Sequence, residues 1–375
     1  MQILTADIGT GTQDILLFDS ERTPENCLKL VVPSPTLRLS RLVRAATAAR
    51  RPLLITGRLM GGGPVSWAVE DHRRAGLPVL STVGPARTFN DDLDKVQREL
   101  GIVLIDDAEA AALMGADRHA HVEFRDFDYA AIRQAFFAFG LDLRPDAVAL
   151  AVFDHGAAPP HISDRQFRMD YLADRLRRDE RLSALAFRSP DVPPDMTRLA
   201  ALAETAAEAG PWPAVVMDTA PAAVLGALDD PIVARQPHPI VVNIGNFHTL
   251  AFQFGAGRLI RMFEHHTGEL TPDRLAAWLR ALAGGSIHHD AVFADNGHGA
   301  LVLDDTPQPL DFIAVVGPRR TLLRGTDLPL HLAVPHGDQM LAGCYGLLHA
   351  CADIEPAWRD PIRDALAGAA DRSLW

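Results

Sequence analysis

Lysine is almost missing from this sequence. Only two of its 36 basic residues are lysines, Lys29 and Lys95, and neither lies in a glycine-rich turn. Schiff-base chemistry needs a reactive lysine, and a P-loop needs one directly after its glycines. The sequence therefore argues against both.

Cysteine is also scarce. Cys27, Cys344 and Cys351 are the three cysteines, and they form no CxxC or CxxxCxxC group. Such groups are the usual signature of a zinc site or an iron–sulfur cluster. So few unpaired cysteines are typical of a reducing compartment, and we expect a cytoplasmic protein.

Long apolar runs and an excess of basic charge are absent as well. No run of about 18 apolar residues is present, and the first residues lack a basic segment followed by an apolar core. The formal charge is −12 and the pI is about 5.6. Because nucleic acids and anionic membranes bind basic surfaces, we expect neither as a partner.

The length and composition are those of a globular protein. A chain of 375 residues with 48% hydrophobic residues predicts about two domains with sizeable cores. Strand and helix patterns alternate in both halves, which favours an α/β fold. A stretch rich in proline separates the halves, so we predict an N-terminal domain at 1–155, a connector or cap at 156–210 and a C-terminal domain at 211–375.

The first fourteen residues, MQILTADIGTGTQD, predict a strand, a polar turn and a second strand. Glycines let such a turn approach a ligand, and threonine hydroxyls and free amides can face a phosphate. Asp7, at the end of the first strand, is placed to bind a metal or its bound water. The alternative is a plain hairpin.

The second half repeats this design. NIGNFHT, residues 243–249, joins two further apolar segments just as the first turn does. Buried-type strands elsewhere end at Asp154 and Asp218, and the GGG at 61–63 precedes a helix start, where an anion would be favoured. A helix cap at Asp218 and an ordinary turn at 61–63 are the alternatives.

Histidines are concentrated late in the chain, where ten of the fifteen lie from His238 onward, many beside glycine. Imidazoles near neutral pH can bind Zn, Fe or Mn, or can transfer protons. Each histidine taken alone is better explained as a hydrogen-bonding turn residue, and only the group as a whole indicates a site. The predicted metal ligands are Asp7, His155, Glu264, His265, His266, His298, His336 and Asp338, with His248 as a catalytic candidate.

The paired turns resemble the superfamily of acetate and sugar kinases, heat-shock chaperone ATPases and actin. The resemblance implies two ribonuclease-H-like domains with an interdomain cleft that binds ATP and Mg²⁺, where Asp218 or Asp154 orients the nucleophile. VGPRR, residues 316–320, is similar in position to the adenosine-side loop. The implied cofactor-binding residues are Gly9, Thr10, Gly11, Thr12, Gly245, Asn246, Thr249, Gly317 and Arg319.

A narrower resemblance is to a prokaryotic family labelled pyruvate formate-lyase activating enzyme. It rests on ADIGTGTQD, LMGGGP, VFDHG, MDTAPAA, NIGNFHT, FEHHTG, NGHG, GPRR and PHGD. Activators of that type use a three-cysteine cluster motif, which these scattered cysteines do not make. We therefore do not predict that activity.

The main hypothesis is an ATP- and Mg²⁺-dependent phosphotransferase or ATPase acting on a small molecule in the cleft. One departure is Asn243, where the superfamily usually has an acid, because an amide cannot accept a proton as a general base. The alternatives are a hydrolase or lyase with a histidine-bound transition metal, and a non-catalytic nucleotide switch or assembling actin-like protein. The oligomeric state is left open, with a homodimer as one option.

Overall fold

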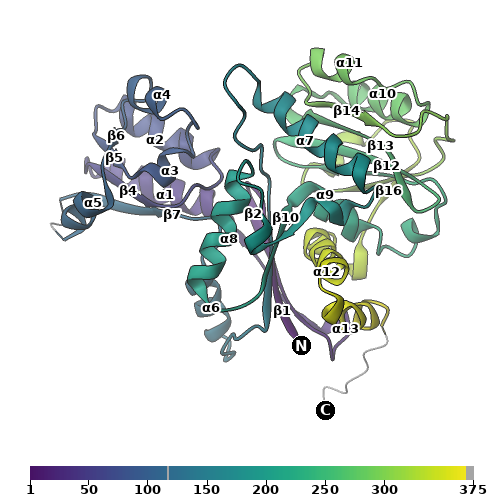
Figure 1. Cartoon of the computed structure of the whole chain (residues 1–375), viewed down its shortest axis with the longest axis horizontal. Coiled ribbons are helices and arrows are strands. Elements are labelled where there is room, and N and C mark those ends of the chain that lie inside the picture. The colour runs from purple at the N-terminus through teal and green to yellow at the C-terminus, as the bar shows by residue number, and fades with distance from the viewer. Residues whose placement is uncertain (116–117, 369–375) are drawn as a thin grey trace.

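The computed structural model describes residues 1–115 and 118–368. The first sheet in this part of the chain has the order β3-β2-β1-β8-β10-β9 (Figure 1). The β1–β2 and β2–β3 pairs are antiparallel, whereas β1–β8 and β8–β10 are parallel. The strands are β1 (Gln2–Ile8), β2 (Thr12–Asp19), β3 (Leu28–Pro33), β8 (Ala147–Val152), β9 (Ala186–Arg188) and β10 (Ala214–Asp218).

The second sheet repeats this topology, in the order β14-β13-β12-β11-β15-β16. Its β11–β12 and β12–β13 pairs are antiparallel, and β11–β15 and β15–β16 are parallel. When β9 is left out of the first sheet and β14 out of the second, the five remaining strands of each sheet, counted along the chain, lie in the spatial order 3-2-1-4-5. The strands are β11 (Ile240–Ile244), β12 (His248–Gly255), β13 (Arg258–His266), β14 (Gly299–Val302), β15 (Ile313–Val316) and β16 (Leu330–Leu332).

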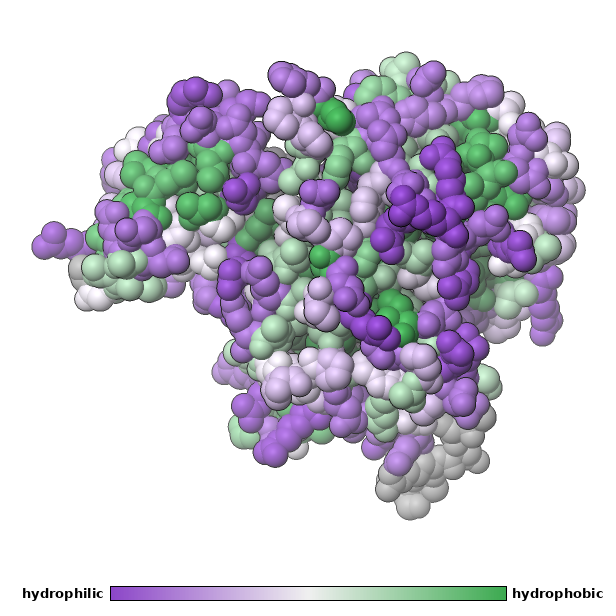
Figure 2. All heavy atoms as spheres, viewed as in Figure 1, coloured by the Kyte–Doolittle hydropathy of each residue, from purple (hydrophilic) through white to green (hydrophobic). Residues whose placement is uncertain are grey.

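A third sheet is inserted between β3 and β8. It is parallel throughout, in the order β6-β5-β4-β7, and its strands are β4 (Leu53–Gly57), β5 (Val79–Ser81), β6 (Val103–Leu104) and β7 (Ala120–Phe124). With the neighbouring helices α1 to α5 it forms a separate lobe beside the first sheet (Figure 1). Hydrophobic side chains gather on the face of this lobe that Figure 2 shows. The sequence analysis did not separate this lobe from the rest of residues 1–155.

Several helices begin directly after a residue whose side chain caps them. Ser34 accepts a hydrogen bond from the amide of Leu37, and Thr271 from that of Arg274, each just before a proline at the first helical position. The helices are α1 (Pro35–Ala48), α2 (Pro64–Arg74), α3 (Val83–Ala86), α4 (Leu93–Arg98), α5 (Asp107–Met114), α6 (Tyr129–Phe137), α7 (Asp164–Arg178), α8 (Thr197–Ala209), α9 (Thr219–Ala227), α10 (Pro272–Ala283), α11 (His289–Ala294), α12 (Ala342–Ile354) and α13 (Pro356–Leu366).

Helices α9 and α12 pack backbone against backbone at two glycines. A Cβ atom on Gly226 would lie 1.8 Å from the carbonyl oxygen of Ala342, and one on Gly346 would lie 1.8 Å from that of Ala222. Both helices contribute to one hydrophobic core that also contains Val215 of the first sheet. The same core takes side chains from the second sheet, so this helix pair connects the two sheets.

The predicted fold class is confirmed, because the chain is α/β and the sheet topology of the first half recurs in the second. One predicted boundary differs from the strand pairing. The prediction assigned residues from 211 onward to the C-terminal domain, whereas β10 pairs with β8 in the first sheet. Parallel strands distant in sequence carry no local signal of their pairing, which is why this strand was misplaced.

Candidate functional site

A cavity of about 1100 Å³ lies between the two repeated sheets and the third one. Three glycine-containing segments line it: residues 9–12 between β1 and β2, residues 61–63 before α2, and residues 245–248 between β11 and β12. Asp7, Asp14 and Asp154 also line it. The two turns that the sequence analysis paired therefore do open onto one space.

These two turns approach each other closely. A Cβ atom on Gly11 would lie 3.2 Å from the side-chain nitrogen of Asn246. Each turn is closed by one backbone hydrogen bond, from Gly9 to Thr12 and from Gly245 to His248, both 2.9 Å. Within the described part of the chain, the turn amides of residues 10, 11, 246 and 247 donate no hydrogen bond. They are therefore available to an anion.

Asp7 and Asp14 form a pair of buried carboxylates beside the first turn. The register of the β1–β2 ladder places them directly opposite each other. Burial is the main cause that raises the pKa of Asp7 to about 7, and nearby Asp218 adds to it. Burial followed by the charge of Asp7 raises the pKa of Asp14 to about 8. Both causes would be relieved by a bound cation.

Asp154 is held by backbone amides. One carboxylate oxygen accepts from Gly156 and the other from Leu199, both at 2.8 Å. Burial raises its pKa, and these hydrogen bonds act against that rise. With both oxygens occupied, Asp154 fixes the loop after β8 to the start of α8, which leaves it poorly placed to accept a proton.

Asp218 is committed to a buried ion pair. Arg168 of α7 donates to it at 2.7 Å, and the amide of Ala220 donates to it at 3.2 Å as an N-terminal cap of α9. The same arginine donates to both oxygens of Glu264 at 2.9 Å. Arg168 therefore joins the connector helix to a strand of each repeated sheet.

A second arginine holds the segment at residues 61–63. Arg198 forms two hydrogen bonds with Asp126, at 2.7 and 2.9 Å, and donates to the carbonyl of Phe153 at 2.6 Å. The amide of Gly61 donates to the same aspartate at 3.2 Å. A Cβ atom on Gly61 would lie 2.4 Å from the guanidinium, so the close approach requires glycine here. These contacts hold residues 61–63 in a fixed position along the side of the cavity.

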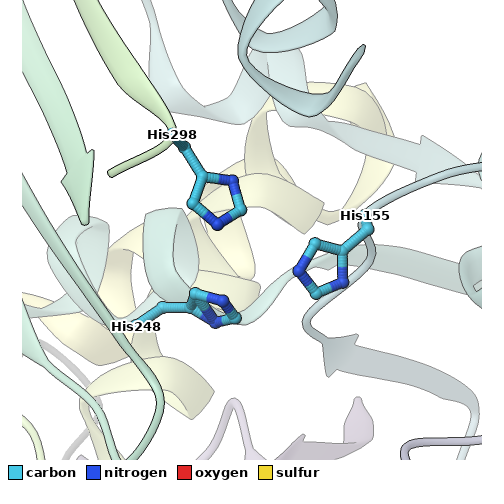
Figure 3. A group of neighbouring side chains, drawn as sticks. All are labelled: His155, His248 and His298. Atoms are coloured by element: carbon cyan, nitrogen blue, oxygen red, sulfur yellow. The ribbon is translucent and has the colours of Figure 1, made fainter. Parts of the chain in front are cut away.

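Three histidines converge next to the second turn. The rings of His155, His248 and His298 point toward one another (Figure 3), and one ligand nitrogen from each lies within 4.8 Å of the others. His266 joins them, because its Nε2 atom lies 3.2 Å from that of His298. Burial is the main cause that lowers the pKa of His298 to about 2, and burial also lowers the pKa of His155 and His248 far below the usual value. These rings are therefore neutral.

Strand register brings these histidines together. His248 opens β12 and pairs directly with His266 at the end of β13. His298 immediately precedes β14, and its amide donates to the carbonyl of Glu264 at 2.9 Å. His155 arrives from the loop after β8 of the other sheet. Three rings thus come from the second sheet and one from the first.

Other residues predicted for the site lie elsewhere. The side chain of His265 points to the opposite face of β13 from that of His266, as the alternation of side chains along a strand requires. Its Nε2 atom lies 3.2 Å from a carboxylate oxygen of Asp295. Thr249 is fully buried, and its hydroxyl forms a 2.9 Å hydrogen bond with the hydroxyl of Thr267, so it does not line the cavity. His336 contacts Asp229 at 3.1 Å.

The last predicted residues are also accounted for. Asp338 caps a short helix by accepting from the amide of Met340. Gly317 lines the cavity, whereas Arg319 is exposed and does not. Glu264 lies behind the ring of His298, where one of its carboxylate oxygens is 3.4 Å from Nδ1 of that histidine.

Sequence reasoning missed Asp14, Arg168 and Arg198. Asp14 had a usable signal, because a hairpin that turns at residues 9–12 pairs positions 7 and 14. Arg168 and Arg198 had no such signal in the sequence, since both lie in the segment that was predicted to be only a connector or cap. Their carboxylate partners lie at least 50 residues away in the chain.

The cysteines do not form a cluster site. All three are free and buried, and burial raises the pKa of each thiol. A metal-binding cysteine needs the opposite, a stabilised thiolate. No helix within residues 1–115 and 118–368 is long and apolar enough to cross a membrane.

The duplicated 3-2-1-4-5 sheets with a cavity between them define a protein with the fold of the actin-like ATPase and sugar-kinase superfamily. The chain belongs to the family described as "Putative pyruvate format-lyase activating enzyme (DUF1786)", whose model matches residues 60–322. Both predicted resemblances are thereby confirmed, although the name of the family describes an activity for which the buried cysteines are unsuited. No protein with a curated description matches the chain.

Solved structures with some similarity include kinases. The inorganic polyphosphate/ATP-glucomannokinase of Arthrobacter sp. strain KM is 11% identical over 94% of this chain and 99% of its own, with a TM-score of 0.35. The ROK hexokinase of Thermus thermophilus is 14% identical over 93% and 98%, with a TM-score of 0.30. The ethanolamine utilization protein EutJ of Carboxydothermus hydrogenoformans is 12% identical over 92% and 89%, with a TM-score of 0.32. Similarity at these TM-scores is too low to add to the assignment, which rests on strand order and on the family.

Proposed function

We propose that this protein is an ATP- and Mg²⁺-dependent enzyme, a phosphotransferase or ATPase, that acts on a small molecule in the cavity between the repeated sheets. The observation that carries the proposal is the close approach of two glycine turns, at Gly11 and Asn246, beside the carboxylates of Asp7 and Asp14. Free amides on one side and acidic groups on the other are the parts that a metal-bound polyphosphate needs.

The turns fit a phosphate chain. A Cβ atom on Gly11 would lie 3.2 Å from the side-chain nitrogen of Asn246, and within the described residues the amides of residues 10, 11, 246 and 247 are unpaired. In a site that excludes water, such preorganised donors stabilise negative charge far better than they do in solution. They would hold the phosphates from opposite sides of the cavity.

The carboxylate pair fits Mg²⁺. One oxygen of Asp14 is buried without a hydrogen-bond partner among the described residues, and the charge of Asp7 adds to the effect of burial in raising the pKa of Asp14. Mg²⁺ is commonly held by one or two carboxylates together with substrate phosphates. When bound, the ion would neutralise charge that develops on the phosphate oxygens.

The remaining residues would position the substrate. Because Asp154 and Asp218 already bind backbone amides and Arg168, we assign them the support of the cavity wall instead of proton transfer. Arg87 and Lys95 of the third sheet's lobe line the same cavity and would attract an anionic second substrate.

Calorimetric titration with ATP and MgCl₂ tests the proposal. Wild-type protein should bind ATP, and Gly11→Val should weaken binding at least about tenfold, because the side chain enters the space between the turns. Gly268→Val is the matched control, since no atom lies within 4 Å of a Cβ there. Folded wild-type protein that neither binds nor hydrolyses millimolar ATP would contradict the proposal.

A further inference from the structure

We propose that His155, His248, His266 and His298 bind one divalent first-row transition-metal ion, of which Zn²⁺ is the reference, at a site that joins the two repeated sheets. This inference does not depend on ATP binding. It concerns a second site that lies directly after the second glycine turn, because the carbonyl of His248 closes that turn.

The ring spacing matches a single ion. Imidazole nitrogens lie about 2.0–2.1 Å from Zn²⁺, so two tetrahedral ligand nitrogens are about 3.3 Å apart and the ring centroids about 5 Å apart. The Nε2 atoms of His266 and His298 are 3.2 Å apart. Five centroid separations among the four rings run from 4.8 to 5.6 Å.

The outer hydrogen bonds orient two of the rings as metal ligands. Nδ1 of His266 lies 2.8 Å from the carbonyl oxygen of Asn296, which can only accept, so this nitrogen carries the proton. In the neutral form of this ring, the Nε2 atom presents a lone pair toward His298. Metal-bound histidines typically donate their other nitrogen to a carbonyl or a carboxylate in this way.

His298 shows the same arrangement with a carboxylate. Its Nδ1 atom is 3.4 Å from Glu264 and has no hydrogen-bond partner among the described residues. If the proton of the neutral His298 ring is on Nδ1, the Nε2 lone pairs of His298 and His266 face each other and repel. If the proton is on Nε2, the Nδ1 lone pair of His298 faces the carboxylate of Glu264 and is repelled by it. A cation between the Nε2 atoms removes both conflicts.

The surroundings are built to hold these rings still. Arg165 of α7 donates to the carbonyl of Gly297, next to His298, and its guanidinium lies over the ring of Phe293. The ring of Phe153 stacks on His248 with centroids 4.0 Å apart. Side chains fixed in this way lose little entropy when a metal binds.

The donor set selects the kind of metal. Four imidazole ligands and no first-sphere carboxylate suit Zn²⁺, Fe²⁺, Co²⁺ or Ni²⁺ and not Mg²⁺ or Ca²⁺, which prefer oxygen. The buried guanidinium of Arg168 is paired with both Asp218 and Glu264, and these two carboxylates offset its positive charge beside the proposed ion. His155 and His248 line the cavity, which places the ion where a cavity ligand can reach it.

The test is metal analysis of the full chain, purified without a histidine tag from zinc-supplemented medium. Elemental analysis should find about one ion per chain, and X-ray absorption should show nitrogen ligands at about 2.0–2.1 Å. His298→Asn and His155→Asn should each lower zinc affinity at least about tenfold. His155 is in a loop, so its variant remains informative if the buried substitution prevents folding.

His265→Asn is the matched control, because this neighbour of His266 points to Asp295 and should keep the metal. Wild-type protein with no metal and a Zn²⁺ Kd weaker than about 10 µM would overturn the proposal. Equal metal loss in the His265 and His298 variants would do so too. ATP binding measured on the same samples separates this result from a failure of the nucleotide site.

Discussion

Asp7 and Asp14 lie directly opposite each other in the β1–β2 ladder, so two buried carboxylates share one end of the cavity. Like charges at opposed positions destabilise a strand pair unless a cation or a proton neutralises them. A cation bound at this position would therefore stabilise the strand pair.

The first prediction concerns Mg²⁺ and these carboxylates. In EDTA at about pH 9, where both carboxylates are ionised, Asp14→Asn should raise the melting temperature above that of wild type by about 2–4 °C, because it removes one of two buried like charges. Millimolar Mg²⁺ should raise the melting temperature of wild-type protein and leave that of the variant unchanged. Gln13→Ala, a neutral neighbour on β2, should behave as wild type. Equal Mg²⁺ shifts in all three proteins would refute a role of Asp14 in binding the ion.

The second prediction concerns the buried arginine of α7. Arg168→Met should lower the unfolding free energy by about 3–5 kcal/mol in urea denaturation, because Asp218 and Glu264 keep their charges without a partner. Arg177→Met on the same helix removes an exposed guanidinium and should change stability by less than about 0.5 kcal/mol. Similar losses in both variants would show that helix α7 is sensitive to any arginine substitution.

The third prediction concerns the contact between α9 and α12. Gly226→Ala should destabilise the protein by at least about 1–3 kcal/mol, because its Cβ atom would lie 1.8 Å from the carbonyl oxygen of Ala342 and would push the helices apart. Gly268→Ala, where nothing lies within 4 Å of the Cβ, is the control. Thermal melts followed by circular dichroism measure both. A neutral Gly226 variant would show that this helix pair separates at little cost.

The fourth prediction concerns pH and His349. Burial acts to lower its pKa, but the 2.7 Å hydrogen bond to Asp229 outweighs burial and raises the pKa above the usual value. Asp353 raises it further, while Arg363 opposes the rise. The charged form therefore stabilises the folded state fully below about pH 6.5, and this contribution is lost as the pH rises through the folded pKa.

His349→Gln should consequently lower the unfolding free energy more at pH 6 than at pH 9, by about 1 kcal/mol between the two. His336 shares the same aspartate and stays in place in this variant. His288→Gln, an exposed histidine before α11, should show no such difference. Parallel stability curves for wild type and the His349 variant would count against the assignment.

The sequence by itself determined the local elements and the duplication. The alternation of apolar and polar residues around DIGTGTQD and NIGNFHT depends only on strand period and turn chemistry, which act over a few residues. Local signals of the same kind, a capping residue followed by a proline, stand at the observed starts of α1 and α10. The pairing of the two turns across a cavity could therefore be predicted.

Only the tertiary structure decided which side chains meet. Pairing with β8 placed β10 in the first sheet, and strand register selected His266 for the histidine cluster while it turned His265 and Thr249 away. Arg168 pairs with the carboxylates of Asp218 and Glu264, which lie on strands 50 and 96 residues away in the chain. Such choices depend on long-range packing and on the burial of charge, which no local pattern in the chain records.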